Sequence, residues 1–179
     1  RFARTILELG GNNAAIVTPS ADLTLTTRAV VFAAVGTAGQ RCTTLRRLFA
    51  HRDVYERLLQ RLQRAYMTLP IGNPLEPATL VGPLIDAAAF ERMESALSSA
   101  RAAGATITGG DRVHPAGLDG GCYVRPALVE VAAPLPVMQQ ETFAPILYVM
   151  RYEHFEQAVA LQNGVRQGLS SSVFSNDVR

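Results

Sequence analysis

Cys42 is the residue whose surroundings are best suited to chemistry. It lies in residues 36–44 (GTAGQRCTT), where small side chains leave room around the thiol. Arg41 places a positive charge directly before it, and a nearby cation favours the thiolate, which is the nucleophilic form of cysteine. The segment therefore points to covalent catalysis through sulfur. The alternative is that Cys42 is a small buried hydrophobic residue, as free cysteines often are.

Glu8 is the second candidate and lies 34 positions before Cys42, in residues 8–11 (ELGG). A carboxylate can serve as a general base, and paired glycines let the backbone approach another group closely. The alternative is a turn with a solvated glutamate.

The remaining cysteine and the histidines suggest no further chemistry. Cys122 matches no motif, and we expect it to be structural. His51, His114 and His154 do not have the spacing of metal ligands, so we expect no metal site. Two distant cysteines do not make a disulfide framework, which favours reduced thiols in a reducing compartment, the cytoplasm.

The elements that must position these residues follow from the pattern of apolar residues. Short apolar runs predict strands over residues 13–17, 45–51, 106–108, 123–131 (with a break at Pro126), 145–152 and 169–174. Longer periodic segments predict helices over residues 23–35, 53–67, 86–103 and 153–163. This alternation predicts an α/β fold with a largely parallel sheet and helices on both faces.

Two of the helices can be described further. Ser20 or Asp22 is expected to cap the helix over residues 23–35, which is apolar nearly all round and is therefore predicted to be buried. The helix over residues 53–67 has one apolar face and a solvated face that carries several arginines.

Composition excludes several classes of protein. Of the 179 residues, 48% are hydrophobic and 18% are charged, which is typical of a folded domain rather than a disordered chain. The net charge of +2 comes without a basic cluster interleaved with aromatic residues, so no nucleic-acid partner is expected. The longest apolar run, residues 29–35, is far shorter than the roughly 20 residues of a membrane span.

Three motifs, in this order, resemble the aldehyde dehydrogenase superfamily. They are residues 8–11 (ELGG), 39–42 (GQRC) and 140–145 (QETFAP), and the last is similar to the family's Glu-x-Phe-Gly-Pro motif. The resemblance covers the whole chain and implies the fold of that family's catalytic domain. Residues 36–44 and 141–149 are most similar to the antiquitin branch, which oxidises α-aminoadipic semialdehyde.

The resemblance also implies roles for particular residues. Cys42 would attack the aldehyde carbon, hydride would pass to NAD or NADP, and a thioester would remain on the sulfur. Glu8 would activate the hydrolytic water, and the Cys42 N–H would help to hold the oxyanion. The residues implied to contact the cofactor are Glu141, at the ribose, and Phe143, Leu9 and Gly10, near the nicotinamide.

Arg41 carries the expectation about the substrate. In the antiquitin branch, an arginine before the nucleophile suits a distal carboxylate on the aldehyde, which a guanidinium can bind with two hydrogen bonds. The alternative is that Arg41 only tunes the thiol or pairs with a local acid.

The chain ends suggest a piece of a longer protein. The sequence begins without Met and stops directly after a predicted strand. We expect residues 1–179 to form an incomplete catalytic domain that lacks the cofactor-binding domain and the oligomerisation segment of a homodimeric or homotetrameric parent. The isolated chain is therefore expected to be inactive in NAD-dependent oxidation. The alternatives are a non-catalytic truncated α/β module and an enzyme that passes the acyl group to coenzyme A.

Overall fold

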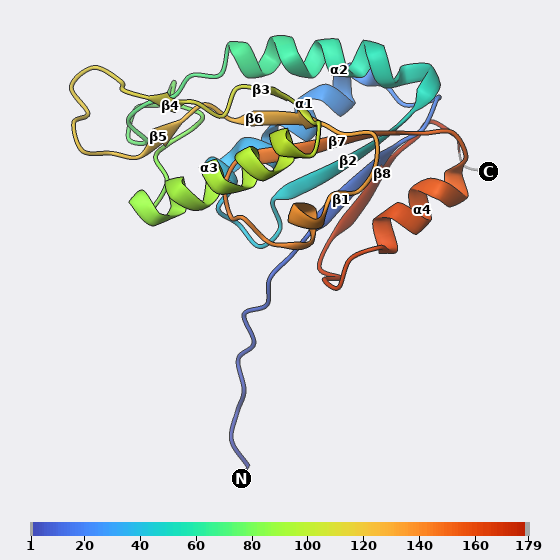
Figure 1. The fold of residues 1–179 in the computed structure, drawn as a ribbon, viewed down its shortest axis with the longest axis horizontal. Coiled ribbons are helices and arrows are strands. Elements are labelled where there is room, and N and C mark those ends of the chain that lie inside the picture. The colour runs from blue at the N-terminus through green and yellow to red at the C-terminus, as the bar shows by residue number, and fades with distance from the viewer. Residues whose placement is uncertain (1, 178–179) are drawn as a thin grey trace.

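A six-stranded sheet forms the centre of the structure, a computed structural model that describes residues 2–177. Its strands lie in the order β3-β6-β7-β2-β1-β8 (Figure 1). Their bounds are β1 Asn13–Val17, β2 Leu45–His51, β3 Thr106–Thr108, β6 Ala127–Glu130, β7 Ile146–Tyr152 and β8 Ser171–Phe174. All neighbouring pairs run parallel except β3 and β6. The predicted, largely parallel sheet is confirmed.

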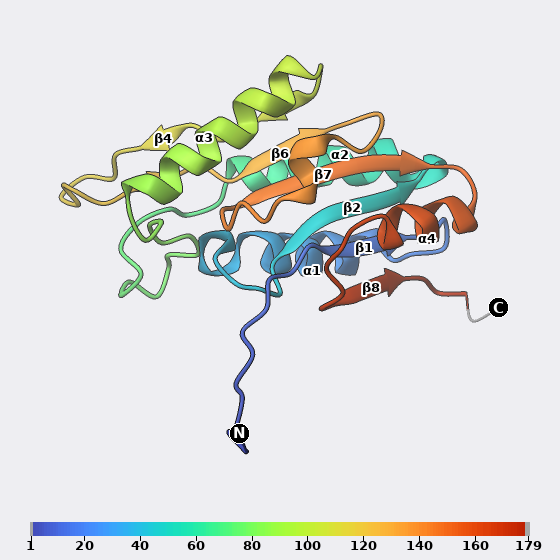
Figure 2. The ribbon, with the colours of Figure 1, turned by 60° about the horizontal axis from the view of Figure 1, so that its bottom comes forward.

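Helices cover both faces of this sheet, as predicted. α1 (Leu23–Val35) and α2 (Arg52–Met67) pack together on one face, whereas α3 (Ala87–Ala102) and α4 (Phe155–Asn163) lie on the other (Figure 2). Two short 3-10 turns, η1 (Gly36–Gly39) and η2 (Pro136–Gln139), were not expected from the sequence. None of the helices within residues 2–177 has the length and apolar character needed to cross a bilayer.

Residues 123–131 divide between two sheets at Pro126. β5 (Tyr123–Val124) pairs with β4 (Arg112–Val113) in a separate two-stranded sheet, and β6 joins the main sheet. Proline has no N–H to donate to a ladder, so the predicted break becomes a change of sheet. β8 also begins later than expected.

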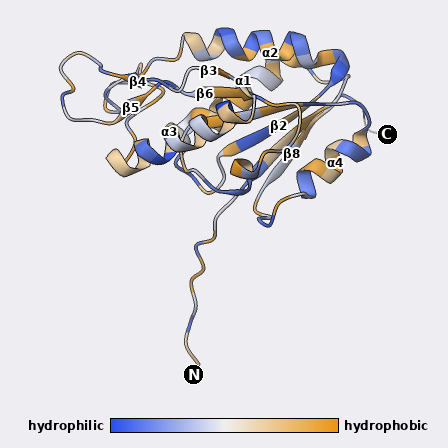
Figure 3. Cartoon of the chain, viewed as in Figure 1, coloured by the Kyte–Doolittle hydropathy of each residue, from blue (hydrophilic) through white to orange (hydrophobic). Residues whose placement is uncertain are grey.

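The apolar stripe of α2 faces the sheet, as its periodicity predicts. Val54, Leu58, Leu59, Leu62 and Tyr66 are all buried. Hydrophobic colour gathers on the strands, while α2 alternates between hydrophobic and hydrophilic residues (Figure 3). Burial of this stripe is what fixes α2 against the sheet.

α1 is capped as expected but is not buried all round. The Asp22 carboxylate accepts hydrogen bonds from the N–H groups of Thr24 and Leu25, at 2.8 and 3.1 Å. On the outer face, Leu25 and Phe32 are 62% and 61% exposed, so the prediction of a fully buried helix is wrong. Among residues 2–177, only the face of α1 that points toward the sheet and α2 is covered.

The pairing of β1 with β2 is irregular at the end nearest Cys42. Asn13 lies opposite Leu45, but the next residue, Ala14, lies opposite Arg47, which leaves Arg46 as an extra residue. Such bulges bend a strand and redirect a side chain. Here the bulge marks the point where β2 begins after the segment of residues 36–44.

Candidate active site

The nucleophile loop, residues 36–44, connects α1 to β2 through a tight turn. Thr37 and Ala38 have φ of 53° and 51°, in the left-handed region that L-residues seldom adopt. Gly39 follows with φ of 70°, and a Cβ there would collide with the backbone of Ala144. This close approach joins the nucleophile loop to the loop of residues 140–145, so two of the three sequence motifs meet in space.

Cys42 is half-buried, and hydrogen bonds hold the peptides on either side of it. The Arg41 carbonyl accepts hydrogen bonds from the Thr44 N–H at 3.1 Å and from Arg46 Nη2 at 3.3 Å. The Cys42 carbonyl accepts a hydrogen bond from Asn13 Nδ2 at 2.7 Å. Within residues 2–177, no group accepts a hydrogen bond from the Cys42 N–H. The loop therefore holds the backbone on both sides of Cys42 and leaves its N–H donor unpaired among residues 2–177.

Gly10 and Gly11 bring the first motif against the other two. A Cβ at Gly11 would collide with the Cys42 carbonyl oxygen, and one at Gly10 would collide with Glu141 Oε2. The Gly11 N–H also donates a hydrogen bond to Glu141 Oε1 at 3.2 Å. The paired glycines thus allow the close backbone approach that was expected from the sequence.

Arg46 is a charged residue of the site that the sequence analysis missed. Its Nη2 lies 3.3 Å from Glu141 Oε1, and its side chain is only 5% exposed. Burial lowers the pKa of the Arg46 guanidinium, and the Glu141 carboxylate opposes that shift. The two arginines inside the strand predicted at residues 45–51 were the available signal, because buried charges need partners.

Glu141 keeps one oxygen free for a ligand. Oε1 accepts hydrogen bonds from Arg46 and from Gly11, whereas no group within residues 2–177 donates one to Oε2. The carboxylate is therefore held in one orientation by one oxygen while the other can accept a hydrogen bond from a hydroxyl group.

Phe143 stands beside a hollow of about 540 Å³. It has φ of 55° and remains 39% exposed. The hollow is lined by Phe143 together with Thr37, Gln40, Pro83, Leu84 and Ile85. The Gln40 carboxamide fixes the opposite wall, since Oε1 accepts from the Ile85 N–H at 2.8 Å and Nε2 donates to the Pro83 carbonyl at 3.2 Å.

Arg41 lies over an exposed aromatic ring and has no acidic partner. Its guanidinium carbon is 5.6 Å from the centre of the Phe32 ring, and a Cβ at Gly36 would collide with Arg41 Nη2. The Nε atom is buried without a hydrogen bond. No carboxylate in the described part of the chain pairs with Arg41, so its charge is available to a ligand.

The structure does not bring Glu8 and Leu9 to Cys42. Both are exposed on the N-terminal segment, which runs away from the body of the molecule (Figures 1 and 2). Leu9 is 66% exposed. The structure thus gathers Cys42, Arg41, Glu141, Phe143 and Gly10 in one place and leaves the expected base outside it.

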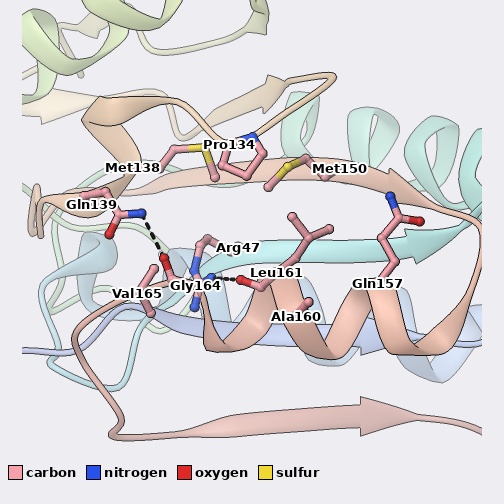
Figure 4. A pocket seen from close by; sticks show the side chains of 10 residues that line it. All are labelled: Arg47, Pro134, Met138, Gln139, Met150, Gln157, Ala160, Leu161, Gly164 and Val165. Carbon is pink, nitrogen blue, oxygen red and sulfur yellow. Dashed lines mark hydrogen bonds between the residues drawn. The ribbon is translucent and has the colours of Figure 1, made fainter.

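A second hollow, of about 330 Å³, lies between η2 and α4 (Figure 4). Arg47 reaches it from β2 and donates hydrogen bonds to the carbonyls of Asn12, Leu161 and Gln162. Burial lowers the pKa of the Arg47 guanidinium to about 10. Arg47 thus joins the segment before β1 to the last turn of α4.

The described residues hold no cluster of three metal-binding side chains. Cys122 is half-buried and free, and it lies opposite Leu84 in an isolated bridge.

Comparison with known proteins gives consistent matches along the chain. The sequence profile of the aldehyde dehydrogenase family matches residues 1–179. Aldehyde dehydrogenase family 7 member A1 of Pisum sativum is 49% identical over 176 residues, which cover 98% of this chain and 34% of that protein. Alpha-aminoadipic semialdehyde dehydrogenase of Mus musculus is 46% identical over 181 residues, which cover 99% of this chain and 33% of that protein.

Solved structures share the fold. Betaine aldehyde dehydrogenase from Staphylococcus aureus, crystallised with NAD+, superposes with a TM-score of 0.91 at 29% identity, over 96% of this chain and 34% of that one. The chain thus spans about a third of the length of the relatives it matches. The resemblance seen in the three motifs is confirmed.

Proposed function

The chain belongs to the aldehyde dehydrogenase family, and on this premise we propose that the full-length protein oxidises an aldehyde to a carboxylic acid through Cys42 with NAD or NADP. The observation that carries the proposal is the geometry at Cys42. Its thiol is half-buried, both flanking carbonyls are held, and its N–H has no acceptor within residues 2–177. Glu141 and Phe143 meet the same loop.

The chemistry follows from the thiol and its N–H group. The Cys42 thiolate adds to the aldehyde carbon, and the Cys42 N–H donates to the oxyanion of the resulting thiohemiacetal. NAD(P), when bound, supplies the acceptor for the hydride that leaves this carbon. Water then adds to the Cys42 thioester, the carboxylic acid leaves, and the thiol is regenerated.

The residues around Glu141 fit the nicotinamide end of such a cofactor. Glu141 Oε2 is free to accept a hydrogen bond from a ribose hydroxyl, and bare Gly10 leaves it room. Phe143 lines a hollow of about 540 Å³, where an aromatic ring can pack. Gly10 already lies against Glu141. Leu9 is 66% exposed in the structure, and we propose that it joins this pocket when residues 2–9 fold back.

We assign the hydrolytic base to Glu8. Gly11 contacts the Cys42 carbonyl, and three residues of extended chain span at most ~10 Å. Glu8 can therefore return to the sulfur when residues 2–9 fold back over the nucleophile loop. This movement is part of the proposal, since Glu8 is exposed in the structure.

We propose an aldehyde with a distal carboxylate as the substrate, such as α-aminoadipic semialdehyde. The support is Arg41, which has no acidic partner among residues 2–177, together with the murine relative, which is an alpha-aminoadipic semialdehyde dehydrogenase. A buried donor without a partner, such as Arg41 Nε, is satisfied when a carboxylate binds.

The proposal extends to assembly and location. A homodimer or homotetramer would cover the exposed apolar residues Leu25 and Phe32 on α1. Two free cysteines are consistent with a reducing compartment such as the cytoplasm.

Substitution of the nucleophile tests the function. Cys42→Ala in the full-length protein should abolish aldehyde-dependent formation of NAD(P)H, a loss of more than about a thousandfold. Cys122→Ala is the matched control and should retain the parent rate. Intact mass of the parent, quenched during turnover, should show an acyl group on Cys42. A Cys42→Ala protein that still oxidises aldehydes would refute the proposal.

A further inference from the structure

We propose that Asn13 is a positioning residue for the nucleophile loop. Its carboxamide holds the carbonyls of Cys42 and Thr44, and with them the turn in which the Thr44 N–H orients the peptide that carries the Cys42 N–H. The inference rests on the proposed function, in which that N–H stabilises the transition state. Asn13 makes no proposed contact with substrate or cofactor, so its role is exerted through Cys42.

Asn13 uses its whole carboxamide to join three segments. It is only 3% exposed. Nδ2 donates hydrogen bonds to the Cys42 carbonyl at 2.7 Å and the Thr44 carbonyl at 2.8 Å. Oδ1 accepts a hydrogen bond from the Ser170 N–H at 3.1 Å. A buried amide with both donors committed has one orientation, which the loop must match.

These bonds extend the sheet where its regular pairing stops. The register of β1 and β2 shifts between Asn13 and Ala14, so the backbone ladder does not reach Cys42. Asn13 Nδ2 supplies the missing donors from a side chain. Gly11 allows the close approach, since a Cβ there would collide with the Cys42 carbonyl oxygen.

The Cys42 N–H lies in the same planar peptide as the Arg41 carbonyl. The peptide before Cys42 is held at the Arg41 carbonyl by Thr44 and Arg46. The peptide after it is held at the Cys42 carbonyl by Asn13 alone among side chains of the described residues. Asn13 Nδ2 also holds the Thr44 carbonyl, so loss of this group loosens the turn in which the Thr44 N–H orients the Arg41–Cys42 peptide. Misaligned donors stabilise an oxyanion poorly.

Asn12 provides a matched control next to it in the chain. It is equally buried, at 3% exposed, and its Nδ2 also donates to a backbone carbonyl, that of Met138, at 2.6 Å. This bond joins the residue before β1 to η2 and does not involve the nucleophile loop. The two asparagines thus separate a general loss of packing from a loss of positioning.

The test compares two reactions of the same thiol in the full-length protein without cofactor. In acylation by p-nitrophenyl acetate, the thiolate adds to the ester carbonyl, an oxyanion forms, and p-nitrophenolate leaves. In alkylation by iodoacetamide, the thiolate displaces iodide at a saturated carbon, and no oxyanion forms. Only the first reaction needs an aligned Cys42 N–H. Acylation is followed by release of p-nitrophenolate, and alkylation by mass analysis at Cys42.

We expect Asn13→Asp to slow acylation by at least about tenfold and to change alkylation by less than about twofold. The carboxylate keeps the size and the acceptor of asparagine but lacks both donors. Asn12→Asp should change the two rates by the same factor. Should Asn13→Asp fail to fold, Asn13→Ser removes the second donor and carries the same comparison.

Two results would overturn the inference. One is an Asn13 variant that acylates at the parent rate, and the other is a parallel fall in acylation and alkylation. Failure of the proposed function looks different, because Cys42→Ala would then leave aldehyde oxidation intact whatever Asn13 does.

Discussion

Arg41 is the residue on which the proposed substrate specificity rests. Its guanidinium lies over Phe32, 5.6 Å from the ring centre, with Nε buried and unpaired. The expected alternative of a local acidic partner finds no support within residues 2–177. A cation so placed can bind a carboxylate on the far end of an aldehyde.

Arg41→Ala in the full-length protein should raise KM for a carboxylate-bearing semialdehyde by about 10- to 100-fold, since a charged hydrogen-bonded pair contributes about 1.5–3 kcal/mol. KM for a neutral aldehyde of similar length should change by less than about twofold. Steady-state kinetics on both substrates provide the measurement. Arg41→Lys keeps the charge without the planar fork and should recover only part of the difference. Equal losses on both aldehydes would contradict this role.

At the scale of the elements, two buried tyrosines differ in whether their hydroxyl group has a hydrogen-bond partner. Tyr66, on α2, is 2% exposed, and its hydroxyl has no hydrogen-bond partner. Burial accordingly raises the pKa of Tyr66. Tyr152, at the end of β7, is 1% exposed, and its hydroxyl donates to the Val17 carbonyl at 3.1 Å.

The two tyrosines should therefore respond oppositely to loss of the hydroxyl. Tyr66→Phe should raise the free energy of unfolding by about 1 kcal/mol, because an unsatisfied buried hydroxyl is removed. Tyr152→Phe should lower it by about 1–2 kcal/mol, since the Val17 carbonyl loses its partner. Urea unfolding of parent and variants measures both changes. Destabilisation by Tyr66→Phe would show that its hydroxyl is satisfied in solution.

At the scale of the whole molecule, the chain spans about a third of the length of its relatives. The hollow beside Phe143 and the free Glu141 oxygen offer contacts to only one end of a dinucleotide. Holding reactants in a productive geometry is a large share of enzymatic rate, so a partly bound cofactor is a poor hydride acceptor.

The isolated 179-residue chain should therefore show no NAD-dependent aldehyde oxidation above background. It should still become acetylated on Cys42 by p-nitrophenyl acetate, because thiol attack on an ester needs no cofactor. Absorbance at 340 nm and intact mass give the two readouts, with circular dichroism to establish that the chain is folded. Measurable NAD-dependent turnover by the folded chain would contradict the expectation.

The local sequence pattern was sufficient to predict the helices and strands and to recognise the three motifs. Alternation and 3.6-residue periodicity are properties of neighbouring residues, and they predicted β1, β2 and α1 at the observed bounds. The motifs identified Cys42 and Glu141 because each lies in a short, recognisable segment.

Contacts between segments that are distant in sequence were decided only by the tertiary structure. Arg46 meets Glu141 across 95 positions, and Asn13 joins Cys42 and Ser170 across 29 and 157. The tertiary structure also showed that the outer face of α1 is exposed and that Glu8 lies away from the thiol. Periodicity encodes which face of an element is apolar, whereas partners of buried polar groups are set by how the elements pack. The sequence therefore pointed to Cys42 as the proposed nucleophile, and the fold determined what holds its loop in place.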